Sequence, residues 1–312
     1  MRTPFDALRG STLARLTGSA RDRGEMSATV RSARARFIAG PRVEDAVEAA
    51  ERLRHTNRLA ILHPLLPPPQ EASQVATLVA ACRRALREMD GLGLSRDHGS
   101  DLLVTPDQLG LPLGRDIART SLLALASIAD GWGARVTLGE GRIDQVEDVL
   151  SLVDEARDLH PHTGVTVVAR RHRSDADAAA LAEKGARVRL VRGGPGEPMT
   201  DAWSDRHEAD LAWTRCLATL LAAPGETALV THDPRLLEVA DALIYHHELG
   251  PDQVEQQMYY GVQPEQQKRL ADAGHRVRVL IPYGPDWYDD LAQLASRPST
   301  PTGFWRVWSG RG

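Results

Sequence analysis

The sequence predicts a closed (β/α)8 barrel, an α/β fold, preceded by additional helices. Short β-branched apolar runs alternate with amphipathic helical segments along the chain, which is typical of parallel βαβ units. Eight strand-then-helix units follow one another, and eight units within about 250 residues are typical of a barrel. A doubly wound open sheet is the alternative topology for the same alternation.

The elements are assigned from hydrophobic periodicity, which differs between strands and helices. Ahead of the first strand, residues 5–37 have the pattern of short arginine-rich helices, and residues 43–54 that of an amphipathic helix. The strands are expected at residues 59–66, 101–105, 134–140, 164–170, 187–194, 228–233, 254–261 and 276–284. The helices that follow them are expected at residues 71–89, 114–131, 144–158, 174–185, 204–222, 234–248, 264–273 and 286–296. Three prolines, at residues 67–69, end the first strand because proline has no N–H for a sheet ladder.

No linker, low-complexity segment or internal repeat divides the chain, so the sequence predicts one folded domain. We expect a helical extension at residues 1–42 that packs on the barrel, the barrel itself at residues 43–298, and a tail at residues 299–312.

The composition is that of a globular protein with little net charge. The 312 residues include 38 basic and 42 acidic side chains, which gives a formal charge of −4. This balance offers no electrostatic footprint for nucleic acid and no basic stripe for an anionic membrane. The amino terminus lacks the apolar segment of a signal peptide, and no apolar run approaches the length of about 18–20 residues that spans a bilayer. We therefore expect a cytoplasmic protein without a transmembrane segment.

No metal site is expected. The two cysteines, Cys82 and Cys216, have neither CxxC nor Cys/His ligand spacing. The paired histidines within residues 160–162 and 246–247 lack a carboxylate or cysteine partner at a recognised spacing.

In a barrel of this kind, the chemistry takes place at the carboxyl ends of the strands. Polar side chains are concentrated at those ends, at His63, Thr105, Asp107, Glu140, Arg170, Arg171, Arg189, Arg192, Thr231, His232, Asp233, Gln257, Tyr260 and Tyr283. These residues are the candidates from which a site would be built.

Four of the strand ends resemble the proline dehydrogenase family. The matching segments are RLVRGG at 189–194, THD at 231–233, EQQMYYG at 255–261 and VRVLIPYGPDWY at 277–288. The resemblance extends over about residues 35–298. It implies an FAD-dependent enzyme on a distorted eight-stranded barrel, which takes a hydride from the carbon beside the ring nitrogen of its substrate. It also implies a small-molecule amine or imino-acid substrate and a quinone or another electron acceptor.

The resemblance gives roles to seven residues at these strand ends. Arg189 is expected beside the N5 edge of the flavin as the catalytic residue, and an ion-paired barrel arginine is the alternative. The expected cofactor-binding residues are Arg192, Gly193, Gly194, Thr231, His232 and Glu140. For the two glycines the alternative is a turn out of the strand, and for the histidine it is a hydrogen bond to the next loop. Gln257 and Tyr260 are expected to pack at the top of the barrel.

The substrate contacts that the resemblance implies are missing almost as a set. The family has a lysine where this chain has Thr105, an aspartate at Gly139 and a tyrosine at Leu280. The family glutamine that contacts the flavin falls near Val168 of this chain. The arginine pair that binds the substrate carboxylate is also absent near Gln293. We therefore expect oxidation of a proline-like cyclic amino acid to its imine, with proline itself bound weakly. Two alternatives stay open: a flavoenzyme for another amine or imino acid, and a redox-inactive barrel paralogue that serves as a binding protein.

Overall fold

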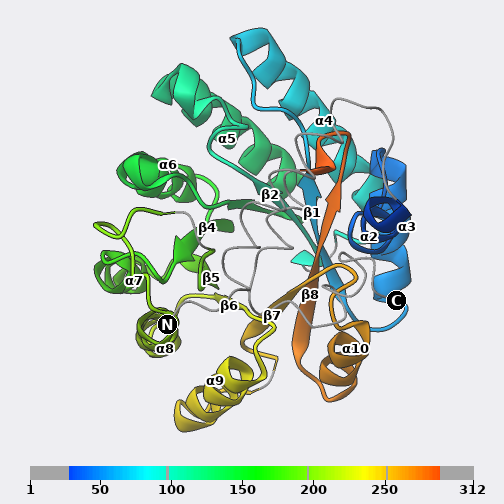
Figure 1. Cartoon of the computed structure of the whole chain (residues 1–312). Coiled ribbons are helices and arrows are strands. Elements are labelled where there is room, and N and C mark those ends of the chain that lie inside the picture. The colour runs from blue at the N-terminus through cyan, green and yellow to red at the C-terminus, as the bar shows by residue number, and fades with distance from the viewer. Residues whose placement is uncertain (1–27, 96–97, 195–196, 251, 289–312) are drawn as a thin grey trace.

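A closed barrel of eight parallel strands forms the centre of the computed structural model (Figure 1). The structure describes residues 28–95, 98–194, 197–250 and 252–288. The strands are β1 (Leu59–Pro64), β2 (Ser100–Val104), β3 (Arg135–Leu138), β4 (Thr163–Val168), β5 (Arg187–Val191), β6 (Thr227–Val230), β7 (Glu255–Tyr259) and β8 (Arg276–Tyr283). Each strand pairs with its neighbours in chain order, and β8 closes the ring by pairing with β1. The predicted (β/α)8 barrel is confirmed, and the open sheet is excluded.

Helices of the described residues surround this ring (Figure 1). They are α2 (Ala28–Phe37), α3 (Val43–Arg54), α4 (Ala72–Gly91), α5 (Arg115–Gly131), α6 (Val146–Arg157), α7 (Ser174–Glu183), α8 (Arg206–Leu221), α9 (Pro234–His246) and α10 (Pro264–Asp272). Two short 3-10 helices cover Leu111–Leu113 and Ile143–Gln145. Over the described ranges, none of the helices is both long enough and apolar enough to cross a bilayer.

Helix α3 occupies the outer position between β8 and β1, where a regular barrel would place the helix that follows β8. Its apolar face contacts both of these strands, and Figure 1 shows it beside them. Of the helix predicted at residues 286–296, only residues up to 288 belong to the described part. The predicted extents of the extension and the tail depend on residues 1–27 and 289–312, which also lie outside it.

The barrel interior has two layers of different character, because every second residue of each strand points inward. The layer at the carboxyl ends is apolar and packs against Phe37, Ile38 and Trp287; it comprises Ile61, Leu103, Val168, Val191, Val230, Tyr259 and Leu280. The layer nearer the amino ends is polar and comprises Asp101, Arg135, Thr137, Arg187, Arg189, Glu255, Gln257 and Arg278. The charges of this deeper layer therefore face one another instead of bulk water.

The end of α2 and the segment that follows it lie against the carboxyl ends of β7 and β8. The N–H of Gly284 donates to the carbonyl oxygen of Gly40 at 2.9 Å. Gly261 has a φ of +72°, and a Cβ on it would lie 2.1 Å from the carbonyl oxygen of Arg36. Only glycine permits this approach, so the close contact between the end of α2 and the residue after β7 requires Gly261.

Candidate active site

Five of the six predicted cofactor-binding residues line one hollow at the carboxyl end of the barrel. Its walls are Glu140, Arg192, Gly193, Thr231 and His232, together with three apolar-layer residues at the ends of β5, β6 and β7. The hollow has a volume of about 40 Å³, so it is a shallow floor and not an enclosing cavity. Strand ends that are far apart in the sequence thus meet at one place.

Arg189 lies one layer deeper than this hollow and does not line it. Its side chain is 4% exposed, and its Nε donates to Oε1 of Gln257 at 2.9 Å. Because β5 and β7 are not neighbouring strands, this hydrogen bond crosses the barrel interior. Within the described residues the Arg189 guanidinium forms no ion pair, whereas Arg187 pairs with Asp101 at 2.5 Å. Arg189 therefore places an uncompensated positive charge beneath the hollow.

Arg192, at the edge of the hollow, belongs to a cluster of charges. It forms an ion pair with Asp210 at 2.9 Å and lies 4.0 Å from Asp233, which also binds Arg206 and Arg235. Burial raises the pKa of Asp233, but hydrogen bonds from Arg235 and Arg206 outweigh burial and hold that pKa below its ordinary value. The three guanidinium groups and two carboxylates leave this cluster one positive charge in excess, a setting that favours an anionic ligand.

The two glycines after β5 differ in their surroundings. Gly193 has a φ of +93°, and a Cβ on it would lie 2.6 Å from Cγ1 of Val168. The turn out of the strand therefore requires glycine at this position. A Cβ on Gly194 would meet no described atom within 4 Å, so the Gly194 backbone borders open space.

Thr231 and His232 are both buried and both hydrogen-bonded to backbone N–H groups. The Thr231 hydroxyl accepts the N–H of Asp233 at 3.1 Å, and Nε2 of His232 accepts the N–H of Tyr259 at 3.0 Å. The histidine thus contacts the neighbouring strand β7, where the alternative expectation had placed a loop.

The positions of the missing substrate contacts lie close together or in the apolar layer. A Cβ on Gly139 would lie 3.5 Å from Cγ2 of Thr105, so the positions of the lost lysine and aspartate are neighbours. Leu280, at the position of the family tyrosine, is buried in the apolar layer, and so is Val168, near the position of the glutamine that contacts the flavin. Gln293 falls outside the described residues. Two positions at which the resemblance implies polar side chains are therefore apolar in this chain.

Sequence reasoning missed the role of the Gln257 side chain, which was expected only to pack. Its Nε2 donates to Oε1 of Glu255 at 2.7 Å, and the same carboxylate oxygen accepts from Nε of Arg278 at 2.9 Å. The signal was the spacing of Glu255 and Gln257, which places both side chains on the same face of one strand.

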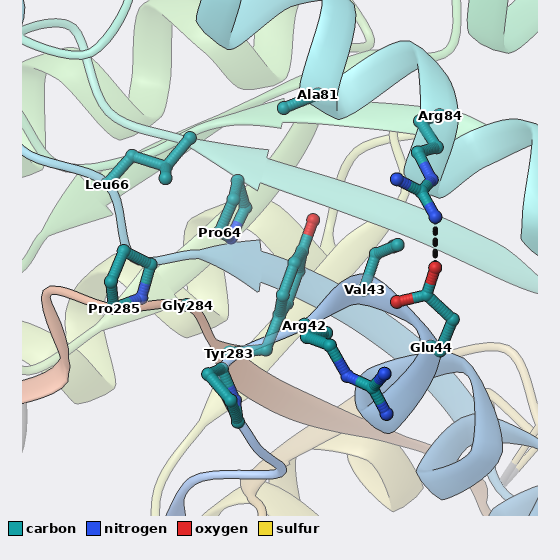
Figure 2. Close-up of a pocket in the computed structure, with 11 residues that line it drawn as sticks. Arg42, Val43, Glu44, Pro64, Leu66, Ala81, Arg84, Tyr283, Gly284 and Pro285 are labelled. Carbon is teal, nitrogen blue, oxygen red and sulfur yellow. Dashed lines mark hydrogen bonds and ion pairs between the residues drawn. The ribbon is translucent and has the colours of Figure 1, made fainter.

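A second cavity, of about 420 Å³, lies away from the predicted cofactor residues. It opens between the start of α3, helix α4 and the ends of β1 and β8 (Figure 2). Its wall includes Pro64 and Tyr283, and an ion pair between Glu44 and Arg84 spans its side. Burial raises the pKa of Tyr283 above its ordinary value. Across the described ranges, no group of three or more His, Cys, Asp or Glu side chains could hold a metal ion.

Comparison with known proteins places the barrel in a family. No family model matches the chain. Proline dehydrogenase 1 of Bacillus subtilis (strain 168) is 30% identical over 268 residues, which are 85% of this chain and 86% of that protein. The chain belongs to the proline dehydrogenase family. The resemblance predicted from the four strand-end segments is confirmed.

Other members and solved structures agree with this placement. Proline dehydrogenase of Deinococcus radiodurans is 29% identical over 260 residues, 81% of this chain and 82% of that protein. The crystal structure of proline utilization A (PutA) from Bdellovibrio bacteriovorus matches with a TM-score of 0.78 at 16% identity, over 91% of this chain and 34% of that one. PutA of Bradyrhizobium japonicum matches with a TM-score of 0.67 at 17% identity, over 89% of this chain and 31% of that one. The chain thus spans about a third of the length of the PutA chains, and at these identities the likeness is one of fold.

Proposed function

We propose that this member of the proline dehydrogenase family is an FAD-dependent oxidoreductase. It oxidises the CH–NH bond of proline, or of a proline-like cyclic amino acid, to the corresponding imine. Family membership supports the reaction class. The observation that carries the proposal is Arg189, a buried arginine without an ion pair in the described part of the chain, at the strand where the family has its flavin-facing arginine.

The donor set around the hollow fits a flavin dinucleotide. The Thr231 hydroxyl, the His232 imidazole and the backbone at Gly194 are ribose and phosphate partners, and the charge cluster of Arg192 favours the pyrophosphate. When bound, FAD supplies the acceptor for the hydride. Arg189 would supply a fixed positive charge that stabilises the reduced, electron-rich form of the cofactor. Since the hollow is shallow, these residues, with Glu140 and Gly193, would support the cofactor from below.

An apolar substrate side favours binding of the carbon ring of a cyclic amino acid over binding of a substrate with additional charged groups. Leu280 presents hydrocarbon where the family has a tyrosine, so binding of the ring depends on burial of apolar surface. This lining is the observation that favours the second candidate, a flavoenzyme for a less polar amine or imino acid. A quinone or another acceptor would take the electrons, and we retain the cytoplasm as the expected location.

The test is the absorbance spectrum of the purified protein, after incubation with FAD and removal of the unbound cofactor. We expect a yellow protein that bleaches without oxygen on addition of L-proline. Bleaching by another cyclic amine, but not by proline, would transfer the proposal to that substrate. A protein that stays colourless, or a yellow one that no amine bleaches, would contradict the proposal and leave the binding-protein alternative.

A further inference from the structure

We infer that Gln257 is a positioning residue, whose side-chain amide holds the guanidinium of Arg189 and keeps it apart from the buried carboxylate of Glu255. The consequence for flavin chemistry rests on the proposed function. The positioning itself concerns only this chain's own residues.

Four side chains form a continuous hydrogen-bond chain inside the barrel. Arg278 donates from Nε to Oε1 of Glu255 at 2.9 Å, and Gln257 donates from Nε2 to the same oxygen at 2.7 Å. Arg189 donates from Nε to Oε1 of Gln257 at 2.9 Å. All four side chains are at most 5% exposed, so water does not compete for these contacts.

The amide of Gln257 has only one orientation that satisfies both neighbours. An ionised carboxylate can only accept and a guanidinium can only donate. The Nε2 of Gln257 must therefore face Glu255, and its Oε1 must face Arg189. Neither a carboxylate nor an apolar side chain at position 257 could make both contacts.

Arg278 and Glu255, the deep end of this hydrogen-bond chain, are held in place by further contacts. Arg278 donates to the carbonyl oxygens of Ala60, Gly99 and His98 at 2.9–3.0 Å. Burial by itself raises the pKa of Glu255, but the charges of Arg278 and Arg187 outweigh burial and hold that pKa far below its ordinary value. Glu255 thus stays ionised and gives Gln257 a constant acceptor.

Gln257 separates Arg189 from Glu255, as the arginines that surround Glu255 show. Glu255 lies within 4 Å of four arginines, namely Arg135, Arg187, Arg276 and Arg278. Arg189 is not among them, because the neutral amide lies between it and the carboxylate. Gln257 therefore orients Arg189 without neutralising its positive charge.

The experiment compares Gln257→Leu with Gln256→Leu. Gln256 is a glutamine of the same strand, 1% exposed, whose side chain contacts His275 on the opposite face. Exchange of the Arg189 Nε–H is measured first in apoprotein with labelled arginine, by nuclear magnetic resonance. We expect Gln257→Leu to accelerate this exchange at least about tenfold, and Gln256→Leu to leave it unchanged. Equal exchange in wild type and Gln257→Leu would overturn the inference, and so would the same acceleration in both leucine variants.

The second readout is a double-mutant cycle in FAD-loaded protein. Gln257→Leu should slow reduction of the flavin by the amine about tenfold or more in the wild-type background and have little effect in Arg189→Met, because Gln257 acts through Arg189. Equal slowing in both backgrounds would contradict the inference. If no amine reduces the wild-type protein, the proposed function fails, while the exchange measurement in apoprotein still decides whether Gln257 positions Arg189.

Discussion

Nε2 of His232 accepts the backbone N–H of Tyr259 at 3.0 Å, and the centroids of the two side-chain rings lie 5.5 Å apart. This bond joins the end of β6 to the end of β7, on two walls of the hollow. It also assigns the ring proton to Nδ1, since a nitrogen that accepts a hydrogen bond carries no proton of its own. The His232 imidazole therefore links two strands of the barrel, and it is also the group that we propose as a partner of the cofactor.

Replacement of this imidazole should therefore affect both properties. His232→Ala should weaken FAD binding by about 10- to 150-fold, which corresponds to one hydrogen bond to a charged group. It should also destabilise the apoprotein by about 1–3 kcal/mol, because the buried N–H of Tyr259 loses its acceptor. Fluorescence titration with FAD and thermal unfolding measure the two effects. His232→Gln, which can both accept and donate, serves as the control and should recover part of each; an alanine variant with wild-type affinity would refute the assigned role.

The charge of Arg189 should matter for chemistry more than for cofactor retention. We expect Arg189→Met to bind FAD. The amine substrate should reduce the flavin of this variant at least about tenfold more slowly than in wild type. The flavin reduction potential should also be lower, because a cation that stabilises the reduced ring is lost. Stopped-flow reduction and potentiometry are the measurements. Arg215→Met removes an exposed ion pair with Asp175 and is the control that should change neither. Unaltered rate and potential in Arg189→Met would remove Arg189 from the chemistry.

Proline should be a weak substrate. The positions of the family's lysine, aspartate and tyrosine are Thr105, Gly139 and Leu280, so charged hydrogen bonds to a zwitterion are lost there. We expect a KM for L-proline in the millimolar range and a turnover below the ordinary value of about 10 s⁻¹. A dye-linked assay over a wide range of proline concentrations measures both. A micromolar KM with ordinary turnover would mean that other residues of this chain bind the carboxylate.

The buried carboxylate of Glu255 should make stability depend on pH. Its folded pKa lies below the ordinary value of 4.5, so the unfolded chain takes up the proton first as the pH falls. The stabilisation is present in full above about pH 5 and is lost as the pH falls toward the folded pKa. Glu255→Gln should therefore cost about 3–5 kcal/mol at neutral pH, and this difference should shrink below pH 5.

Urea unfolding of both proteins between pH 7 and 3 is the measurement. Glu238→Gln, at an exposed position on α9, is the control and should unfold like wild type throughout. A difference between wild type and Glu255→Gln that stays constant over this range would show that the pKa of this carboxyl is the same in the folded and the unfolded protein.

The fold was predictable because the two hydrophobic periods alternate without interruption along the chain. The boundaries of the individual strands were less predictable. The fifth strand was expected to reach residue 194 and ends at Val191, because the backbone at Gly193 turns with a positive φ. A run of β-branched and small residues does not show where the backbone changes conformation.

The proximity of the candidate residues was predictable, since strand topology brings the strand ends together in any parallel barrel. The contacts between the side chains of these residues were not predictable. Arg189 and Gln257 are 68 positions apart in the sequence and belong to strands that do not pair, so no local pattern joins them. One strand has an inward-facing glutamate and glutamine, and another strand has two inward-facing arginines. The contacts among these side chains can be predicted only when the register of the strands is known.

The location of α3 separates two tasks that a regular barrel assigns to one segment. A helix that precedes β1 shields the seam between the first and the last strand, so the described barrel is closed there without a helix after β8. The sequence after β8 lacks the family's arginine pair, and the packing of α3 on β1 and β8 does not depend on that pair.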